Sequence, residues 1–404
     1  MDNLEKNPYE TIGFELIFPP LMADAEKRGL NLPYGDPSVL KCCKIREKKL
    51  GLIPEELKYS AKTTLSYSME FLGDDVDTEK IKNAQLPNGS LGTSPSATAY
   101  MFEKTKDPDA YGYLKKALDV NKDGSVFSQY PFEIFETAWC IYNLAISSVP
   151  IDDYVQNHLD SLARAMTPRG VCWSSALPIA DSDDTALTMN VMKKFGKNVD
   201  FAVLERYEKD EYFTCFEFEI NASLSANIHV LDLVKDCAGY PRRSEVMEKI
   251  IYYLARTAVS GNHWDDKWHI SPHYATSAAI IALSGLDDWL TARAVGWFLD
   301  CQNPDGSWGL HGGSVEETAY ALQALLHYNE NVERIDTNKL GDGINWLSRN
   351  AGRYCPQFWI AKGLYGPVNV VKMAALGVLY SSETNRGASA AGSYPISAVQ
   401  EVTA

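Results

Sequence analysis

The sequence has no apolar run long enough to cross a membrane, since a helical span needs about 18 apolar residues in succession. The longest candidate, residues 275–286, is shorter and is interrupted by Ser and Thr. Residues 1–6 are polar and acidic, which is typical of neither a secretory signal nor a transit peptide. The eight cysteines include no C-x-x-C pair, a pattern that suits free thiols in a reducing compartment better than disulfides or a zinc site. We therefore expect no membrane span and a cytoplasmic location.

The chain also has fewer positively than negatively charged residues. The 404 residues contain 38 Lys and Arg against 53 Asp and Glu, so the net charge is −15 with histidine neutral. Such a charge argues against general nucleic-acid binding and against docking on an anionic membrane. The remaining composition, 45% hydrophobic and 23% charged, is that of a soluble globular protein, and the length suggests two or three domains.

Alternation typical of strands is scarce, and residues 211–220 are its best example. Apolar residues instead recur at helical spacing, with Pro and Gly between the periodic segments. This pattern predicts helices over residues 155–166, 186–195, 244–259, 275–286, 318–328 and 368–379. The end of the chain is rich in Ser, Ala and Gly and is predicted to be a tail or linker.

An internal repeat organises the chain. Each unit has a polar turn containing Gly, then a large apolar residue, then a helix that opens with an acid-Thr-Ala triplet. The turns lie at residues 88–91, 123–126, 169–173 and 305–308, and the triplets at 136–138, 184–186 and 317–319. Repeated helical pairs of this kind close into α-α barrels or stack as solenoids.

One repeat differs from the others. Asp184 aligns with Glu136 and Glu317 at the helix start, but only this unit gathers three aspartates, in the run Asp181–Asp184. Apolar sequence flanks the run on both sides. Packed carboxyl groups in such a setting cannot all ionise, so one holds its proton at pH 7 and can act as a general acid. The 9 Trp, 22 Tyr and 14 Phe can line an apolar cavity and stabilise a carbocation, which together suggests protonation of an alkene.

The Asp-Ser-Asp-Asp run resembles the D-x-D-D motif of class II terpene cyclases, the family of squalene–hopene cyclase and copalyl diphosphate synthase. Residues 302–308 are similar to the Q-x-x-x-G-x-W repeat of that family. Further segments run in the order seen in copalyl diphosphate synthases: 13–19, 49–54, 63–65, 88–99, Trp173 and 266–268. The resemblance covers about residues 10–380.

The resemblance implies roles for the acidic run and its neighbours. The middle aspartate, Asp183, would be the proton donor, and Asp181 and Asp184 would polarise it. The family places an Asn or His against this acid, and of the two candidates in the segment 225–229 we expect Asn227 rather than His229.

The resemblance also implies how the substrate is held. Lys49 and Lys267 fall at diphosphate-binding positions, and Trp173 and Trp268 would be substrate-binding aromatic residues. Mg²⁺ would bridge the diphosphate to a carboxylate, for which Glu15 is the candidate.

Two features bear on the product. Where plant enzymes that make the ent product carry a His and an Asn, this chain has Tyr67 and Ser128, so another copalyl isomer is expected, with Tyr67 placing the water that takes the last proton. The D-D-x-x-D motif of ionising terpene synthases is absent, because no Asp-Asp pair has its third acid at the right place. The product is therefore expected to keep its diphosphate.

The family's architecture implies an all-α protein of two α-α barrel domains. Residues 1–128 would form a γ-type helical domain and residues 129–382 a β-type barrel with the acidic run, followed by a tail or linker over 383–404. The expected reaction is cyclisation of geranylgeranyl diphosphate, started by protonation, to a copalyl diphosphate isomer. The chain could also belong to a longer protein with a prenyltransferase domain.

Other interpretations remain open. Farnesyl diphosphate could be cyclised to a drimane-type diphosphate, or geranylgeranyl diphosphate to a rearranged bicycle. A protein prenyltransferase β-subunit is also an α-α barrel, but no Asp/Cys/His zinc set is visible. The remotest alternative is a helical-repeat binding module without catalysis.

Overall fold

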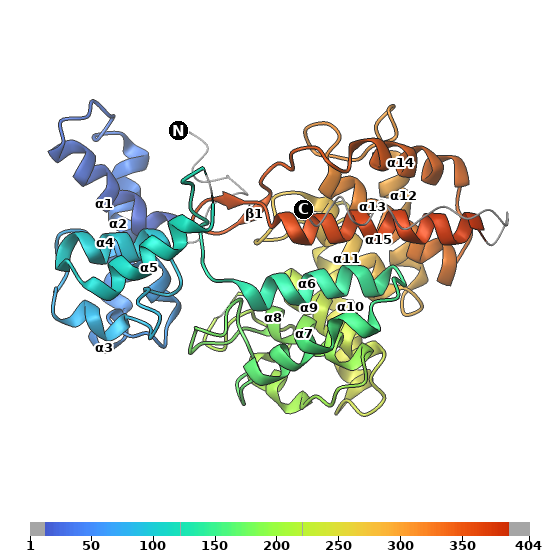
Figure 1. Ribbon diagram of the computed structural model, residues 1–404, viewed down its shortest axis with the longest axis horizontal. Helices are drawn as coiled ribbons and strands as arrows, with labels where there is room; N and C mark the ends of the chain where they lie inside the picture. The colour runs from blue at the N-terminus through green and yellow to red at the C-terminus, as the bar shows by residue number, and fades with distance from the viewer. Residues whose placement is uncertain (1–12, 122, 220, 388–404) are drawn as a thin grey trace.

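The helical prediction is confirmed by a computed structural model, which describes residues 13–121, 123–219 and 221–387. Two groups of helices stand apart in Figure 1. The first contains α1 (Phe14–Lys27), α2 (Pro37–Leu52), α3 (Glu55–Lys58), the 3-10 helices η1 (Thr64–Leu72) and η2 (Lys80–Ala84), α4 (Pro95–Thr105) and α5 (Pro108–Asp119). No helix in the described residues is both long and apolar enough to cross a membrane.

The second group begins at α6 (Glu133–Ile146) and alternates helices along the chain. Its members are α7 (Asp152–Ala165), α8 (Ser182–Lys194), η3 (Phe201–Tyr207), α9 (Leu224–Lys235), α10 (Arg243–Thr257), α11 (Pro272–Leu283), α12 (Asp288–Asp300), α13 (Val315–Asn331), α14 (Thr337–Asn350) and α15 (Val368–Gly387). Each of the six helices expected from periodicity coincides with one of these elements, although four of them (α7, α8, α10 and α11) end one to three residues earlier than expected.

Six helices of the second group form a closed ring. Helix α6 packs on α8, α8 on α9, α9 on α11, α11 on α13, α13 on α15, and α15 returns to α6. Helices α7, α10, α12 and α14 pack on the outside of these six. The arrangement is a two-layered helical structure whose inner helices are almost entirely buried, as the burial of α9 and α11 illustrates.

The sequence repeat corresponds to a recurring hydrogen-bond pattern. At the start of α8, the hydroxyl of Thr185 accepts the N–H of Val171 at 3.0 Å and donates to the carbonyl of the same residue at 3.2 Å. Thr318 makes the same pair of bonds with Trp308. The turn must come very close to α8: Gly170 has a φ of +103°, and a Cβ there would lie 2.2 Å from the Thr185 hydroxyl. These two units are thus each fastened to the turn that precedes them.

Two expectations need correction. Residues 211–219 do not form a strand; the backbone of this segment makes only isolated bridges, 208 with 213 and 214 with 222. Phe213 is buried in the large apolar cluster, Phe216 packs on a separate small cluster and Phe218 is 87% exposed, so the alternating residues do not share one buried face. The expected tail starts too early as well, because α15 continues to Gly387; residues 388–404 lie outside the described residues.

A short hairpin joins the two groups. Strands β1 (Trp359–Ile360) and β2 (Leu364–Tyr365) pair antiparallel between α14 and α15, and Figure 1 shows them between the two groups of helices. The buried apolar side chains form one cluster within residues 59–101 and a larger one within 134–378. A third, small cluster of Leu86, Cys172 and Leu177 lies where the groups meet.

Candidate active site

The acidic run forms the first turn of α8. Asp181 caps the helix, because its carboxylate accepts the N–H of Asp184 at 2.8 Å. The hydroxyl of Ser182 donates to the carbonyl of Thr214 at 2.7 Å. These bonds fix the turn and leave the carboxyl group of Asp183 for other partners.

Asp183 is held by two side chains of α9. Its Oδ1 lies 2.5 Å from Nδ1 of His229, and its Oδ2 accepts the hydroxyl of Ser225 at 2.9 Å. The Asp183 side chain is 13% exposed and that of His229 is 3% exposed. Asp183 is nearly out of water, Ser225 donates to one of its oxygens and His229 contacts the other, so the carboxylate formed when the proton leaves stays hydrogen-bonded.

The expectation that Asn227 lies against the acid is wrong. Its amide bonds the backbone of Phe213 in both directions, at 2.9 and 2.8 Å, and also donates to the carbonyl of Ser223 at 2.7 Å. Asn227 therefore anchors the start of α9 to the preceding turn, as Thr185 anchors the start of α8. The residue against Asp183 is the alternative in the same segment, His229.

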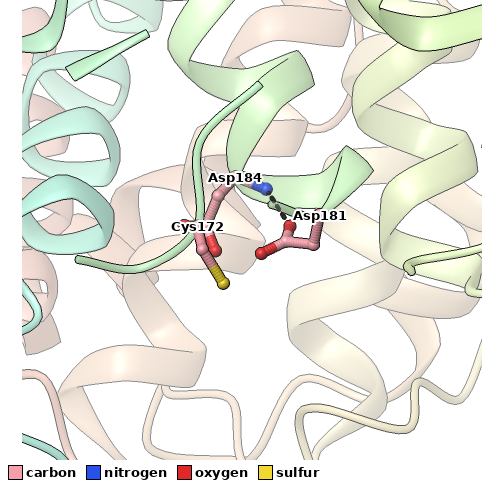
Figure 2. A group of neighbouring side chains, drawn as sticks. All are labelled: Cys172, Asp181 and Asp184. Atoms are coloured by element: carbon pink, nitrogen blue, oxygen red, sulfur yellow. Dashed lines mark hydrogen bonds between the residues drawn. The ribbon is translucent and has the colours of Figure 1, made fainter. Parts of the chain in front are cut away.

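Asp181 and Asp184 form a buried pair with Cys172 (Figure 2). Burial raises the pKa of Asp184 well above its usual value, and the nearby Asp181 raises it further. Burial also raises the pKa of Asp181, to about 6, although its hydrogen bond with Asp184 opposes the rise. One oxygen of Asp184, Oδ1, has no hydrogen-bond partner. The pair therefore holds a proton near neutral pH, with Asp184 as its carrier.

This trio is the one group of three potential metal ligands within the described part of the chain. It does not suit Mg²⁺, which prefers oxygen ligands and keeps several waters. Burial raises the pKa of the Cys172 thiol far above its usual value, which opposes the thiolate that a soft metal requires.

A fourth carboxyl group ties the neighbouring loop to the acid. Asp266 is buried and accepts the backbone N–H of Ser225 at 3.2 Å and that of Trp268 at 3.0 Å. Burial and the proximity of Asp183 raise the pKa of Asp266. This residue thus holds the Lys267 loop next to the α9 residue that bonds Asp183.

Aromatic rings line the ring of helices beside the acid. Trp139 meets His229 edge-on at 5.4 Å between centroids and donates its indole N–H to the hydroxyl of Tyr274 at 3.0 Å. Phe135 stacks on Trp139 at 4.3 Å, and Trp359 of the hairpin contacts Phe135 at 5.0 Å. Such faces carry the negative side of a quadrupole and attract cations.

Tyr67 and Trp173, predicted separately, come together where the two groups of helices meet. Their rings contact edge-on at 5.7 Å, Tyr67 donates to the carbonyl of Ser128 at 3.2 Å, and Trp173 donates to the hydroxyl of Thr93 at 2.8 Å. Burial raises the pKa of Tyr67, so the phenol stays protonated at neutral pH.

The predicted cationic residues each have an acidic partner. Lys49 at the end of α2 forms an ion pair with Glu15 of α1, whose side chain is 17% exposed. Lys267 pairs with Glu219 at 2.6 Å and lies over the ring of Trp268 at 5.1 Å. Glu15 offers a single carboxylate beside a lysine, a donor set that fits a metal ion held mainly by phosphate oxygens and water.

The sequence analysis did not identify several residues of the site. Three of these lie in or beside segments that it singled out, but no spacing indicates a role for them: Ser225, Asp266 and Trp139. Lys362 at the hairpin tip was also missed: its ammonium binds Glu70 at 2.7 Å and two serine hydroxyls of the first group. A lysine inside an apolar run is the signal that could have found it.

Comparison with known proteins identifies the family of the chain. The family described as squalene-hopene cyclase C-terminal domain matches residues 145–329. The type B diterpene cyclase of Mycobacterium tuberculosis is 34% identical over 381 residues, covering 91% of this chain and 75% of that protein. An ent-copalyl diphosphate synthase of a Streptomyces species is 34% identical over 307 residues, covering 73% of this chain and 59% of that protein.

Solved structures give the same result. The ent-copalyl diphosphate synthase from Streptomyces platensis matches with a TM-score of 0.79 and 28% identity, covering 92% of this chain and 77% of that one. The Arabidopsis thaliana ent-copalyl diphosphate synthase, at 22% identity and a TM-score of 0.63, shares the fold over 92% of this chain and 48% of its own. The chain therefore belongs to the class II terpene cyclases, in the family of copalyl diphosphate synthases and type B diterpene cyclases.

Proposed function

We propose that this protein cyclises geranylgeranyl diphosphate to a copalyl diphosphate isomer and leaves the diphosphate in place. The observation that carries the proposal is Asp183, a nearly buried carboxyl group that contacts His229 and Ser225. It lies beside the packed rings of Phe135, Trp139 and Trp359, which are called the aromatic wall below. A C20 substrate is supported by the relatives named diterpene cyclase and copalyl diphosphate synthase.

In this mechanism Asp183 transfers its proton to the terminal alkene of the substrate. The carboxylate left behind keeps its bonds from His229 and Ser225, which favours the transfer. The cation moves along the chain as each double bond attacks it, and two ring closures give a bicyclic cation. The rings of Trp139, Phe135 and Trp359 stabilise it by cation–π attraction and exclude water that would quench it early.

The remaining groups bind the diphosphate or help to remove the last proton. Lys267 and Lys49 attract the diphosphate, and Trp173 and Trp268 contact the substrate beside them. Glu15 is the carboxylate that would hold Mg²⁺, and the ion would supply partial neutralisation of the diphosphate charge. A water near Tyr67 takes the last proton, since the hydroxyl of Tyr67 lies at the junction of the two groups of helices.

We also propose a division of the chain to match. Residues 1–128 would be a γ-type domain, and residues 129–382 a β-type α-α barrel built on the closed ring of six helices. The separate apolar clusters support this division. The substrate would lie between the domains, where Tyr67 and Trp173 meet.

The test is incubation with geranylgeranyl diphosphate and Mg²⁺, dephosphorylation, and gas chromatography with mass spectrometry, beside Asp183→Asn. A copalol isomer from the wild type alone is expected, and chiral retention identifies it. A rearranged bicyclic alcohol, or turnover of farnesyl diphosphate alone, would replace the product assignment but keep the class II chemistry. Uncyclised alcohols from both substrates would overturn the proposal.

A further inference from the structure

A second buried acid occupies the position on α13 that Asp183 occupies on α8. Asp183 lies two residues after the cap Asp181, and Glu316 lies two residues after the cap Ser314. Both caps accept the N–H three residues on, and both helices then place a Thr against the preceding turn. Asp183 and Glu316 are therefore equivalent residues of two inner helices in the same ring.

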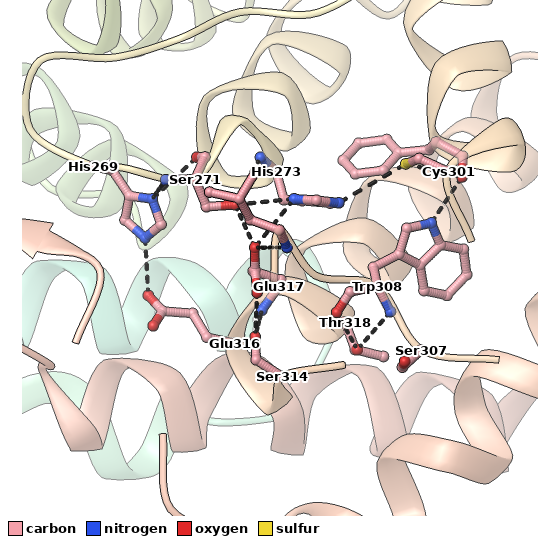
Figure 3. A network of polar contacts seen from close by, with 12 residues as sticks. His269, Ser271, His273, Cys301, Ser307, Trp308, Ser314, Glu316, Glu317 and Thr318 are labelled. Carbon is pink, nitrogen blue, oxygen red and sulfur yellow. Dashed lines mark hydrogen bonds and ion pairs between the residues drawn. The ribbon is translucent and has the colours of Figure 1, made fainter. Parts of the chain in front are cut away.

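Glu316 also has a histidine partner, as Asp183 does (Figure 3). Its Oε1 lies 3.2 Å from Nε2 of His269 and accepts the indole N–H of Trp359 at 2.7 Å. Nδ1 of His269 lies 3.1 Å from both the backbone nitrogen and the carbonyl oxygen of Ser271, which holds the imidazole ring in place. The indole N–H of Trp359 and Nε2 of His269 thus meet at one oxygen of Glu316.

The other oxygen of Glu316 has no partner. Oε2 makes no hydrogen bond although the side chains of Glu316 and His269 are both 0% exposed. A buried polar atom left unpaired destabilises a fold and calls for an explanation beyond packing. A Gln or a Met at this place would fill similar volume without an unpaired carboxylate oxygen.

Trp359 connects this acid with the aromatic wall. Its ring contacts Phe135 at 5.0 Å, Tyr274 at 4.7 Å and Trp139 at 6.4 Å. Trp139 in turn meets His229, the partner of Asp183. The two acid–histidine pairs are therefore joined through a continuous set of rings.

We propose that Glu316 is a positioning residue that acts through Trp359, supplying a fixed negative charge behind the aromatic wall for the cation formed during cyclisation. The inference rests on the proposed function. An indole that donates its N–H to a carboxylate gains electron density on its face, which strengthens its attraction for a cation. Removed from water, the charge itself also acts at longer range than a surface charge.

The test compares Glu316→Gln with Glu317→Gln. Gln keeps the oxygen that accepts from Trp359 and removes the charge. Glu317 is the matched control, since it is equally buried on the same turn but bonds Ser271 and Ser314 instead of the aromatic wall. Each variant is titrated with an isoprenoid diphosphate that carries a tertiary ammonium in place of a cationic carbon, and with its uncharged carbon analogue.

We expect Glu316→Gln to bind the ammonium probe about tenfold or more weakly, while its affinity for the uncharged analogue stays the same. We also expect the variant to lower kcat more than it changes KM. Glu317→Gln should lower Tm without changing the ratio of the two affinities. If Glu316→Gln does not fold, Trp359→Phe removes the indole donor but keeps a ring, and the same loss of discrimination is expected.

An unchanged ratio of affinities in a folded Glu316→Gln or in Trp359→Phe would overturn the inference. Failure of the proposed function is a separate result, because it would be seen in the wild type as absence of any cyclic product. If the wild type forms a cyclic product and Glu316→Gln keeps the wild-type ratio of affinities for the ammonium probe and its uncharged analogue, only the role assigned to Glu316 is refuted.

Discussion

Nδ1 of His229 lies 2.5 Å from Oδ1 of Asp183, and this contact joins two helices, α8 and α9, at the middle aspartate of the acidic run. Because His229 is 3% exposed and Asp183 13% exposed, the bond is sheltered from water. In the proposed mechanism, the histidine would orient the acid and stabilise the carboxylate that forms when the proton leaves.

The first prediction concerns this contact. Asp183→Asn should lower cyclisation by about 10³-fold or more, because the amide cannot release a proton, and His229→Leu by roughly 10–100-fold, because the acid loses a donor but stays in place. Turnover of geranylgeranyl diphosphate and circular dichroism spectra check both. Activity close to wild type in a folded Asp183→Asn would contradict the assignment of the proton donor.

The second prediction separates Asn227 from catalysis. Asn227→Ala leaves the backbone N–H and carbonyl of Phe213 without partners, which should destabilise the protein by about 2–4 kcal/mol and lower Tm by several degrees. Activity per folded molecule should change little. Asn227→Thr, which introduces the residue that other units use, should recover part of the loss. A large fall in kcat at unchanged Tm would restore a catalytic role for Asn227.

Much of the site could be predicted from the sequence because it is built on a repeat. The run of three aspartates distinguishes this unit from the others, and the resemblance to the D-x-D-D motif marked Asp183 within it. The repeat of turn and acid-Thr-Ala triplet likewise located helix starts, although not the hydrogen bonds that anchor the helices. What could not be predicted is which member of the segment 225–229 reaches the acid. Extending the repeat to α9 would have aligned Ser225 with Asp183 and Asn227 with Thr185, but α9 lacks the acid-Thr-Ala triplet that reveals the register.

Other contacts depend on chain segments that are far apart. Lys362 meets Glu70 across 292 positions, and Trp359 meets Glu316 across 43. Neither pair has a spacing that indicates a contact. Residues 211–219 show the opposite error, since a local alternation there is overridden by the turn whose backbone Asn227 bonds.

The third prediction concerns pH and the pair Asp181 and Asp184. Burial raises both folded-state pKa values above the unfolded value near 4, so the stabilising contribution of the pair is complete below about pH 4. It is lost as pH rises, through about 6 for Asp181 and at higher pH for Asp184. Asp184→Asn removes the titration of Asp184, so its unfolding free energy and Tm should fall less between pH 4 and 7 than those of the wild type. The exposed Asp153→Asn is the control and should follow the wild type. Parallel curves for Asp184→Asn and the wild type would refute the prediction.

The fourth prediction concerns the link between the two groups of helices. The Lys362 side chain is 13% exposed, burial lowers its pKa, and its ammonium binds Glu70, Ser94 and Ser96 of the first group. Lys362→Ala leaves the Glu70 carboxylate without its cation and should destabilise the protein by roughly 3 kcal/mol. We also expect faster proteolysis between the groups, near residues 120–129.

A matched surface variant tests that prediction. Lys27→Ala breaks an ion pair with Asp74 whose side chains are both more than half exposed, so it should change stability by less than about 1 kcal/mol and leave the proteolysis pattern unaltered. Equal behaviour of Lys27→Ala and Lys362→Ala would mean that the hairpin does not hold the groups together.

The fifth prediction concerns the diphosphate. Lys267 is fixed by Glu219 and lies over Trp268, in a loop that Asp266 fastens beside the acid. Lys267→Gln should raise KM for the isoprenoid diphosphate about tenfold or more and lower kcat much less, because the charge attracts the end of the substrate that does not react. The KM of the wild type should rise with added salt, and that of the variant should rise less.

Lys249→Gln is the control for the fifth prediction. Lys249 also pairs with a glutamate, Glu208, and lies over a ring, Phe213, but it comes from α10 on the outside of the ring of helices. Its replacement should leave KM and the salt dependence as in the wild type. If Lys267→Gln and Lys249→Gln raise KM equally, the effect comes from net charge rather than from a diphosphate site. If neither changes KM, the diphosphate is bound elsewhere, and the Lys49 and Glu15 pair on the first group becomes the site to alter next.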